Sequence, residues 1–397
     1  MNNYLALIEK YKSPLYVYNG DKIISQYNKL QKAFSSWHKV RIHYAMKALN
    51  NIAILKLLKA QGAHIDAVSI GEVKLALFAG FTPKEISFTP NGVPFSEIEE
   101  AVAIGVHITL DNLEQIERYS EKYSKKSIAI RIKPNVKAGG NDKISVGHKG
   151  SKFGIALEDV IEIVALVKAD KLQVDGFHLH TGSDILHTED FLDAAEVLFE
   201  VARQFNNLKF LDFGSGFKVK YNKTDIETDI NTLGKSLTRR FSEFCKDYGS
   251  ELTLVLEPGK FLVSESGKFL ARVTAVKHTT EKRFIFLDSG FNHLMRPMLY
   301  DAYHDIINLS NPSENLKKYD VVGYICETDT FANDRLLSET KSGDVLAFAN
   351  AGAYAFTMAS NYNSRLRPAE VLCLNNTCKL IRKRETFEDL LHNQVLD

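Results

Sequence analysis

Three segments in the middle of the chain carry residue types suited to binding a phosphorylated aromatic ring. GFHLHTGS places His178 and His180 on one face of an extended run, directly before Gly182–Ser183. An imidazole can stack on a flat ligand ring, and the small pair lets the backbone approach a phosphate. The FGSG segment adds Gly214 and Gly216, whose neighbouring backbone N–H groups can close on an anion. Taken singly, such a histidine is more often a buried residue bonded to backbone, and a GxG is a weak signal.

A carboxylate and a lysine at the ends of two further runs extend this set. In LTLVLEPGK the period of two directs Glu257 inward, beside the turn formed by Pro258–Gly259. In RIHYAMK it places Lys47 opposite the aliphatic face, where loss of solvent favours the neutral amine that forms a Schiff base. A lysine there more often reaches water, and an inward carboxylate is more often paired structurally. Combined with the histidine and glycine segments, these residues predict one site.

Eight β-type runs, which alternate with helix-spaced apolar residues, could position these side chains. Their first residues are 22, 22, 22, 20, 47, 34 and 44 positions apart. Eight strands separated by helices predict an α/β fold with a closed parallel (β/α)8 barrel, and an open doubly wound sheet is the alternative. The runs are RIHYAMK (from Arg41), AHIDAVS (Ala63), EISFTPN (Glu85), HITLDN (His107), SIAIRIKPN (Ser127), VDGFHLHTGS (Val174), LKFLDFGSG (Leu208) and LTLVLEPG (Leu252).

In a parallel barrel, ligands bind where the strands end, so the residues at those positions share one rim. The concentration of polar residues and glycines there predicts that the functional site lies at this rim. The residues concerned are Lys47, Ser69, Asn91, Asp111, Asn135, His180–Ser183, Gly214–Gly216 and Glu257–Gly259.

The pattern changes past residue 266, where strands follow one another with few helical stretches between them. FLARVTAV, RFIFLDSG, VVGYICET, DVLAFANA and VLCLNNTCKLIR indicate a second, C-terminal all-β domain. Near the amino terminus, PLYVY is left over from the barrel count, and we expect it to pair with this β domain. The expected organisation is therefore an N-terminal segment 1–35 that contributes a strand to the β domain, a barrel 36–265 and an all-β domain 266–397.

Composition excludes several classes of function. The 397 residues include 50 Lys+Arg and 49 Asp+Glu, a net charge of +1 spread along the chain, which argues against nucleic acid or an anionic membrane as partner. No run approaches the length of a membrane span, and the first residues do not resemble a signal peptide. Four cysteines form no disulfide framework, so we expect a cytoplasmic protein in which Cys245, Cys373 and Cys378 are structural.

Two common types of catalytic centre are not indicated. No CxxC pair, HExxH or i, i+4 ligand cluster occurs, so no metal site is predicted. No GxSxG serine elbow occurs either.

The same segments resemble the alanine racemase-like (fold type III) enzymes, which depend on pyridoxal 5′-phosphate. YAMKALNN is similar to their YAVKAN segment, HLHTGSDI to HxHIGSQ, FGSG to their GGG loop and EPGK to EPGR. In the C-terminal half, RPMLYDAYH, CETDT and GAYAFTMASNYNSRLRPAEVL closely resemble the diaminopimelate decarboxylase family. The match runs in order from about Pro14 to Leu372. It implies decarboxylation of meso-2,6-diaminopimelate to L-lysine by a barrel plus β domain.

The resemblance implies a role for each matching residue. Lys47 would bond to the cofactor aldehyde, His180 would stack on its ring, and Glu257 would keep the ring nitrogen protonated. Cys326, supplied by the partner subunit of a head-to-tail homodimer with sites at the interface, would donate a proton. The phosphate would be held by Ser183, Gly214, Ser215, Gly216, Pro258, Gly259, Lys260 and Tyr354. The amino-acid substrate would be bound by Lys260, Arg296, Tyr300, Glu327 and Tyr354.

Three departures from the family pattern bear on these roles. Lys260 stands where the family usually has Arg, so the positive charge is kept but the planar fork that grips a carboxylate is lost. Ser215 replaces a central glycine, which narrows backbone freedom and offers a hydroxyl to the phosphate site. CETDT differs from CES-GD after Glu327, so we expect a different loop there.

Other interpretations stay open at this point. Cys326 could be a small buried hydrophobe, and Arg296 could form a surface salt bridge. An ornithine- or arginine-type decarboxylase of the same fold would need an acidic group for a distal cation but no arginine for a distal carboxylate. A non-catalytic homologue that binds the cofactor is a further alternative, although the presence of Lys47, Glu257 and Cys326 together favours an enzyme.

Overall fold

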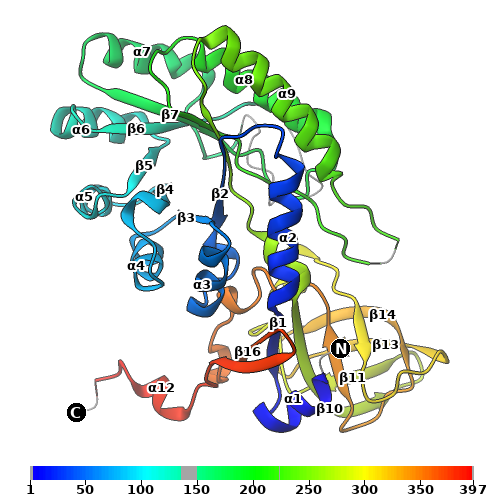
Figure 1. Cartoon of the computed structure of the whole chain (residues 1–397). Coiled ribbons are helices and arrows are strands. Elements are labelled where there is room, and N and C mark those ends of the chain that lie inside the picture. The colour runs from blue at the N-terminus through cyan, green and yellow to red at the C-terminus, as the bar shows by residue number, and fades with distance from the viewer. Residues whose placement is uncertain (1–2, 136–149, 223, 396–397) are drawn as a thin grey trace. The chain divides into compact units, whose positions relative to one another are not determined.

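The computed structural model describes residues 3–135, 150–222 and 224–395, and it divides into two compact units (Figure 1). The barrel unit comprises residues 25–219 and 226–261, and the β unit comprises residues 1–24, 220–225 and 262–397. The first boundary lies within helix α2 (Gly20–Ala33) rather than at the expected residue 35, and the last follows Phe261 rather than residue 265. Within the described ranges, none of the helices has the length and apolar character that crossing a membrane requires.

The barrel unit is a closed cylinder of eight parallel strands. Each strand pairs with the next along the chain, and β9 returns to β2 with Leu254 opposite Val40. This closure confirms the predicted (β/α)8 barrel and excludes the open sheet. The strands are β2 (Val40–Ala45), β3 (His64–Ala67), β4 (Ile86–Phe88), β5 (His107–Leu110), β6 (Ser127–Ile132), β7 (Gln173–Leu179), β8 (Phe210–Asp212) and β9 (Thr253–Leu256).

Helices connect successive strands, and polar caps fix where several of them begin. The side chains of Asn51, Ser69, Asn112 and Asp229 each accept a hydrogen bond from a backbone N–H of the first turn, which satisfies donors that the helix leaves free. The helices are α3 (Ile52–Ala60), α4 (Ile70–Phe78), α5 (Phe95–Ile104), α6 (Leu113–Tyr123), α7 (Val160–Lys168), α8 (Thr188–Ala202) and α9 (Ile230–Tyr248).

A cluster of aromatic side chains links α8 and α9 to the end of β8. Phe213 packs edge-on against Phe199 of α8 and Phe241 of α9, with ring centroids 5.8 Å apart in both pairs. Phe244 stacks on Phe199 at 4.7 Å. Since Phe213 directly precedes Gly214, this aromatic cluster anchors one end of the glycine loop.

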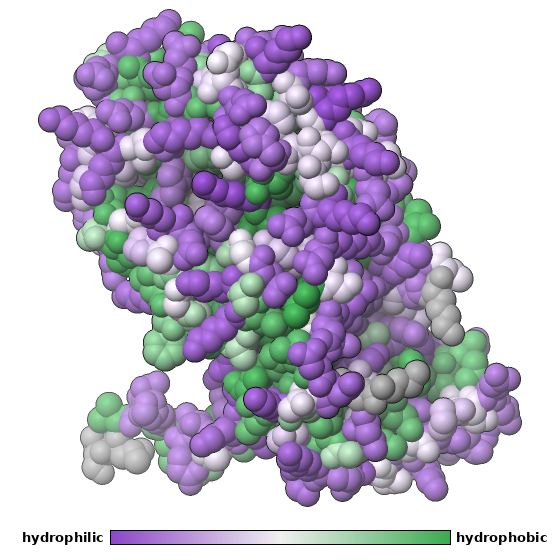
Figure 2. All heavy atoms as spheres, viewed as in Figure 1, coloured by the Kyte–Doolittle hydropathy of each residue, from purple (hydrophilic) through white to green (hydrophobic). Residues whose placement is uncertain are grey.

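Figure 2 shows hydrophilic residues over most of the visible face, with hydrophobic residues in smaller groups between them.

The β unit contains a separate mixed sheet, as the sequence predicted. Its strand β1 (Leu15–Asn19), the PLYVY run, pairs antiparallel with β10 (Gly267–His278) and parallel with β16 (Ala369–Leu374). The remaining strands are β11 (Arg283–Leu287), β12 (Ile306–Asn308), β13 (Leu316–Val322), β14 (Thr330–Ser338), β15 (Val345–Phe348) and β17 (Thr377–Arg382). Short helices are α1 (Tyr4–Tyr11), α10 (Lys260–Val263), which crosses the boundary, α11 (Arg296–Tyr300) and α12 (Phe387–Leu391).

One expectation about the cysteines needs correction. We expected no disulfide framework and a structural role for both residues, but Cys373 of β16 and Cys378 of β17 are bonded to each other. The two residues lie opposite each other in the β16–β17 hairpin, which brings their Cα atoms to 4.0 Å. The residues are five positions apart in the sequence, and they become neighbours because the hairpin register places them opposite each other. The sequence did not reveal this register. Cys245 is buried and free, as expected of a structural thiol.

We expect Gly234→Ala in α9 to destabilise the protein by about 1–3 kcal/mol, although alanine normally favours a helix over glycine. A Cβ at position 234 would lie 2.2 Å from the carbonyl oxygen of Ala33 in α2, so the two helices would have to separate. Urea unfolding monitored by circular dichroism measures the change. The exposed neighbour Lys235→Ala is the control and should change stability by less than about 0.5 kcal/mol. A Gly234→Ala variant as stable as this control would contradict the packing.

Candidate functional site

A buried carboxylate lies where β9 ends at the predicted rim. Glu257 is 7% exposed, and its Oε2 lies 3.0 Å from Nε2 of His178 on β7. Its other oxygen, Oε1, has no hydrogen-bond partner. Burial by itself raises the pKa of Glu257, but His178 and then Lys47 oppose it more strongly, so the pKa lies well below the usual range. The carboxylate is therefore ionised and has one oxygen available for a donor.

A second carboxyl group, that of Asp212 at the end of β8, lies close to Glu257. The ligand atoms of His178, Asp212 and Glu257 all lie within 4.8 Å of one another. Burial first, and then the charge of Glu257, raises the pKa of Asp212 well above its usual value, although the Gly214 N–H donates to it at 2.8 Å. Two close carboxylates rarely ionise together, so the pair carries a single negative charge that resides on Glu257.

Lys47 lies at the same rim but not on a strand. Strand β2 ends at Ala45, and Lys47 belongs to the 3₁₀ turn Met46–Ala48, so the expected strand through residue 47 is two residues too long. Its Nζ forms an ion pair with Asp66 Oδ2 at 3.0 Å, and its side chain is 39% exposed. This ion pair with a carboxylate is a contact that the sequence analysis did not predict.

Asp66 is itself a feature that the sequence analysis did not single out. It lies on β3 and is 1% exposed. Burial, and next the Glu257 charge, raises the pKa of Asp66, while Lys47 lowers it. Its Oδ1 is buried without a partner. Lys47, Asp66, Glu257 and Asp212 thus form one set of interacting titratable groups at the rim of the barrel.

His180 follows the end of β7 and is held by the glycine loop. Its Nδ1 accepts a hydrogen bond from the Ser215 N–H at 3.4 Å. Burial, and then the charges of Arg131 and Lys47, lowers the pKa of His180 well below its usual value, so the ring is neutral. A Cβ at Gly214 would lie 2.8 Å from Nδ1 of His180, and the backbone there has φ +58°, so only glycine fits this approach.

The loops after β7 and β8 approach each other closely enough to form a backbone cradle. A Cβ at Gly216 would lie 2.2 Å from the Gly182 carbonyl oxygen, and Gly216 has φ +115°. The Ile185 N–H donates to the Gly216 carbonyl at 2.8 Å, and Ser183 is half-buried between these contacts. The Ser215 hydroxyl differs from expectation, because it donates to the Glu257 backbone carbonyl at 2.8 Å instead of being left for a ligand.

His178 also differs from its expected bonding. We expected a buried histidine bonded to backbone, whereas its ring pairs with the Glu257 side chain.

The loop after β9 is held by contacts of its own. Lys260, expected to bind ligand, forms an ion pair with Asp184 at 2.7 Å. Pro258 accepts a hydrogen bond from the Ala45 N–H at 3.2 Å, and Gly259 lies against Ala45. The β9 loop is therefore fixed beside the turn that carries Lys47.

Within the β unit, Arg296 is a buried cation rather than the surface residue that was one alternative. It is 6% exposed, its Nη1 donates to the Ala353 carbonyl at 3.4 Å, and its Nε has no partner. Burial, and then the Arg296 charge, lowers the pKa of nearby His304 to about 3. In the described part of the chain, no carboxylate forms an ion pair with Arg296. A buried guanidinium with a free donor suits an anionic ligand group.

The other predicted residues of the β unit lie in its loops. Cys326 is exposed, which excludes the buried hydrophobe, and its Sγ accepts from Asn363 Nδ2 at 3.3 Å. Glu327 accepts a hydrogen bond from the Tyr362 hydroxyl. Tyr354 has φ +54°, a rare backbone conformation for a bulky residue that is typical of functional sites. Tyr300 ends α11 and is half-buried.

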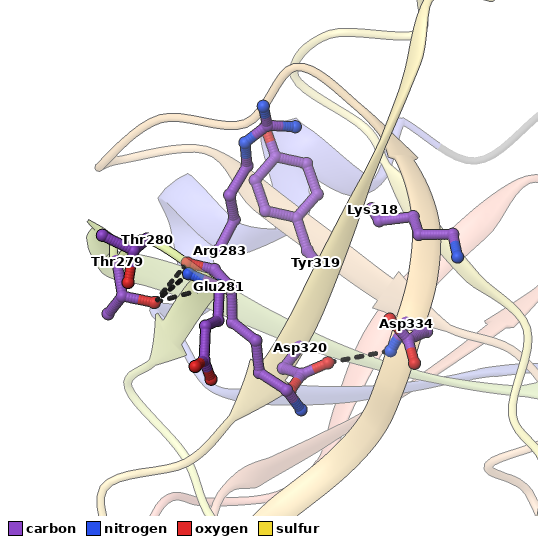
Figure 3. Close-up of a pocket in the computed structure, with 9 residues that line it drawn as sticks. Thr279, Thr280, Glu281, Arg283, Lys318, Tyr319, Asp320 and Asp334 are labelled. Atoms are coloured by element: carbon purple, nitrogen blue, oxygen red, sulfur yellow. Dashed lines mark hydrogen bonds and ion pairs between the residues drawn. The ribbon is translucent and has the colours of Figure 1, made fainter.

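A polar hollow of about 310 Å³ in the β unit does not coincide with these residues (Figure 3). Its acidic side chain Asp320 accepts from Lys282 Nζ at 2.5 Å and from the Asp334 N–H at 2.8 Å. The buried acid is therefore already matched, and the lining includes none of the predicted site residues. We assign no ligand to this hollow.

Comparison with known proteins shows which family the chain is similar to over its length. The family model for the pyridoxal-dependent decarboxylase, pyridoxal binding domain, matches residues 20–264. Diaminopimelate decarboxylase of Methanothermobacter thermautotrophicus is 38% identical over 98% of this chain and 93% of its own length. The chain belongs to the diaminopimelate decarboxylase family. The Campylobacter jejuni member is 36% identical over 98% and 97%. A crystal structure of the Helicobacter pylori enzyme complexed with L-lysine superposes with a TM-score of 0.90 at 35% identity, covering 98% of both chains.

The residues at the rim fit the pyridoxal 5′-phosphate that this family uses. The unpartnered Oε1 of Glu257 suits the protonated ring nitrogen, and the backbone cradle at Gly216 suits the phosphate. The same His178, Asp212 and Glu257 are also close enough to hold a metal, a juxtaposition that sequence spacing did not predict. A metal needs deprotonated ligands, whereas burial favours neutral Asp212, so the set suits a ring nitrogen better.

We expect Asp212→Asn to stabilise the cofactor-free protein, with a gain that is larger at pH 8 than at pH 5. The folded pKa is raised, so folded Asp212 keeps a proton that the unfolded chain releases above about pH 4. Stability is thus lost as pH rises towards the folded pKa, and asparagine removes this loss, about 1–3 kcal/mol near neutral pH. Urea unfolding at the two pH values measures it.

Asp229→Asn is the matched control for this experiment. Hydrogen bonds from Thr232 lower the pKa of Asp229, so its carboxylate stabilises the fold above its unfolded pKa, and the control should lose stability instead. A loss of stability in Asp212→Asn that grows with pH would contradict the assignment of the proton to Asp212.

Proposed function

We propose that this protein decarboxylates meso-2,6-diaminopimelate to L-lysine and CO2 with pyridoxal 5′-phosphate as cofactor. The observation that carries the proposal is the buried, ionised Glu257 with an unpartnered oxygen at the rim that also carries Lys47. The full-length similarity to diaminopimelate decarboxylases supports the choice of substrate, and L-lysine is the ligand named for the Helicobacter pylori relative.

Each rim residue then has a defined task. The bound cofactor supplies a ring that accepts the electron pair released when CO2 departs. Glu257 holds the proton on the ring nitrogen, and the neutral His180 ring stacks against the cofactor. Lys47 would hold the cofactor through its amine, and Asp66 would take up the proton that this amine must lose before it can react. The backbone around Gly216 and Ser183 holds the phosphate.

Residues of the β unit would recognise the substrate's distal end. Diaminopimelate carries a carboxylate and an ammonium group there, so the pocket needs charges of both signs. Arg296 supplies the cation for the carboxylate, and Glu327 supplies the anion for the ammonium. An unpaired buried charge is costly, so a substrate that lacks the distal carboxylate should be rejected. Tyr300 and Tyr354 are proposed to line the same pocket.

The proposed assembly is a head-to-tail homodimer in the cytoplasm, with sites at the interface. In this arrangement Cys326 of one subunit donates a proton to the carbon that has lost CO2 in its partner's site. The exposure of Cys326 and the Asn363 amide at its Sγ support this role, because an amide donor stabilises the thiolate that remains after proton transfer. The balanced net charge of +1 gives no reason to propose a nucleic-acid partner.

A side-by-side assay distinguishes this function from its alternatives. The purified protein is offered meso-diaminopimelate, ornithine and arginine at equal concentration, and released CO2 is measured. We expect CO2 from diaminopimelate. Release from ornithine or arginine alone would favour the other decarboxylase type, and release from none would favour a non-catalytic homologue.

Lys47→Ala should abolish turnover and the absorbance band of the covalently held cofactor, because no other residue is proposed to bond to its aldehyde. Spectra before and after borohydride treatment and L-lysine release measure both effects. Lys59→Ala, which removes an ion pair with Glu85 elsewhere in the barrel unit, is the control. Lysine release by the Lys47 variant would refute the assignment.

Arg296→Met should raise the KM for diaminopimelate about 30-fold, the effect of losing roughly 2 kcal/mol of charge-assisted hydrogen bonding. The spectrum of the bound cofactor should stay as in the parent, since Arg296 is proposed to contact only substrate. Arg272→Met, which removes a more exposed arginine paired with Glu9, serves as the matched control. An unchanged KM would show that Arg296 does not read the distal carboxylate.

Cys326→Ala should lower kcat at least about 100-fold, the usual range for loss of a general acid, while cofactor affinity stays within about twofold. Steady-state kinetics and a cofactor titration separate the two effects. Cys245→Ala, which removes the buried free thiol, is the control and should keep the parent kcat. Equal kcat in the Cys326 variant and the parent would exclude the thiol as the acid.

A further inference from the structure

The ion pair between Lys260 and Asp184 joins two loops of the proposed phosphate site. Lys260 directly follows Gly259 in the β9 loop, and Asp184 directly follows Ser183 in the β7 loop. Their Nζ and Oδ1 atoms are 2.7 Å apart, with side chains only 8% and 17% exposed. A pair this well shielded from water is held more strongly than one at the surface.

The backbone is arranged to present this carboxylate. Asp184 has φ +61°, in the left-handed region that non-glycine residues seldom adopt. The next residue, Ile185, is fixed by its N–H bond to Gly216 at 2.8 Å. The position of the carboxylate is therefore set by the loop itself, and Lys260 reaches towards it rather than towards solvent.

The two residues are also positions at which the chain departs from the motifs it resembles. EPGK has lysine in place of the arginine of EPGR, and HTGSD has aspartate in place of the glutamine of HxHIGSQ. The arginine and the neutral glutamine of those motifs would together carry a charge of +1 at these two positions. Lys260 beside Asp184 gives a net charge of zero, so the two changes together remove one positive charge from the place where anions would bind.

We propose that Asp184 is a positioning residue that weakens anion binding by Lys260. Its carboxylate forms an ion pair with the Lys260 ammonium group, so an incoming anion must compete with this carboxylate. Two anions reach this rim, the cofactor phosphate and, if the proposed function holds, a substrate carboxylate. The proposal predicts that removing the Asp184 charge tightens binding of at least one of them.

Asp184→Asn keeps the side-chain shape and removes the charge. We expect the Kd of the apoenzyme for the cofactor, the KM for meso-diaminopimelate, or both, to fall about fivefold. This is the size of effect expected from losing a partly screened ion pair. Titration of the apoenzyme with pyridoxal 5′-phosphate, followed by absorbance, reports the phosphate, and inorganic phosphate as competitor checks it. Steady-state kinetics report the carboxylate. The titration stays informative even if diaminopimelate is not the substrate.

Lys260→Gln has the opposite expected sign. It removes the ammonium group and keeps the Asp184 carboxylate charge beside the anion, so binding should weaken by about fivefold or more. The double variant carries no charge at either position and should return to within about twofold of the parent. Glu196→Gln, which breaks the Glu196–Arg240 pair between α8 and α9, is the matched control and should change neither affinity.

The signs decide between this proposal and a purely structural ion pair. If the pair only ties the loops together, Asp184→Asn and Lys260→Gln weaken binding alike, and the proposal is wrong. It is also wrong if Asp184→Asn changes neither the titration nor the KM. Thermal melting of each apoenzyme confirms that it folds, and Asp184→Gln, the residue of the resembling motif, replaces Asp184→Asn if that variant does not.

Discussion

The site depends on one ionised carboxylate held inside the barrel. Glu257 stays charged although it is 7% exposed, because the His178 imidazole lies 3.0 Å away and Lys47 adds a positive charge nearby. Burial of a charge without such partners would shift the group to its neutral form. The raised pKa of Asp212 is the counterpart of this arrangement, because it leaves a single negative charge at the point where the ring nitrogen is proposed to bind.

Closure of the barrel is what assembles this charge pattern. His178, Asp212 and Glu257 come from three successive strands, and Lys47 reaches the same rim only because β9 pairs with β2. The Phe213 cluster supports the glycine loop, and the Ala45–Pro258 hydrogen bond fixes the β9 loop beside Lys47. Movement of either loop would lengthen the distances between these charged groups and so weaken their interactions, which act over a few ångströms. The fold therefore serves the chemistry chiefly by making these short distances reproducible.

The sequence predicted the rim well because strand alternation and strand ends are local properties. It predicted Glu257 as inward and placed His180 and the glycine loops together, whereas it extended the Lys47 strand too far. It missed the pairing of Lys47 with Asp66 and of Lys260 with Asp184, because these contacts join residues 19 and 76 positions apart and exist only in the closed barrel. A carboxylate inside the apolar run AHIDAVS was the available signal for Asp66. The Cys373–Cys378 disulfide depended in the same way on a hairpin register.

Protonation of the ring nitrogen is the most direct test of the central claim. Holoenzyme prepared with cofactor labelled with ¹⁵N in the pyridine ring reports this proton through the nitrogen chemical shift. The account predicts a protonated nitrogen in the parent at neutral pH and an unprotonated one in Glu257→Gln, because an amide cannot stabilise the positive charge. An unprotonated nitrogen in the parent, or a protonated one that persists in the variant, would contradict it.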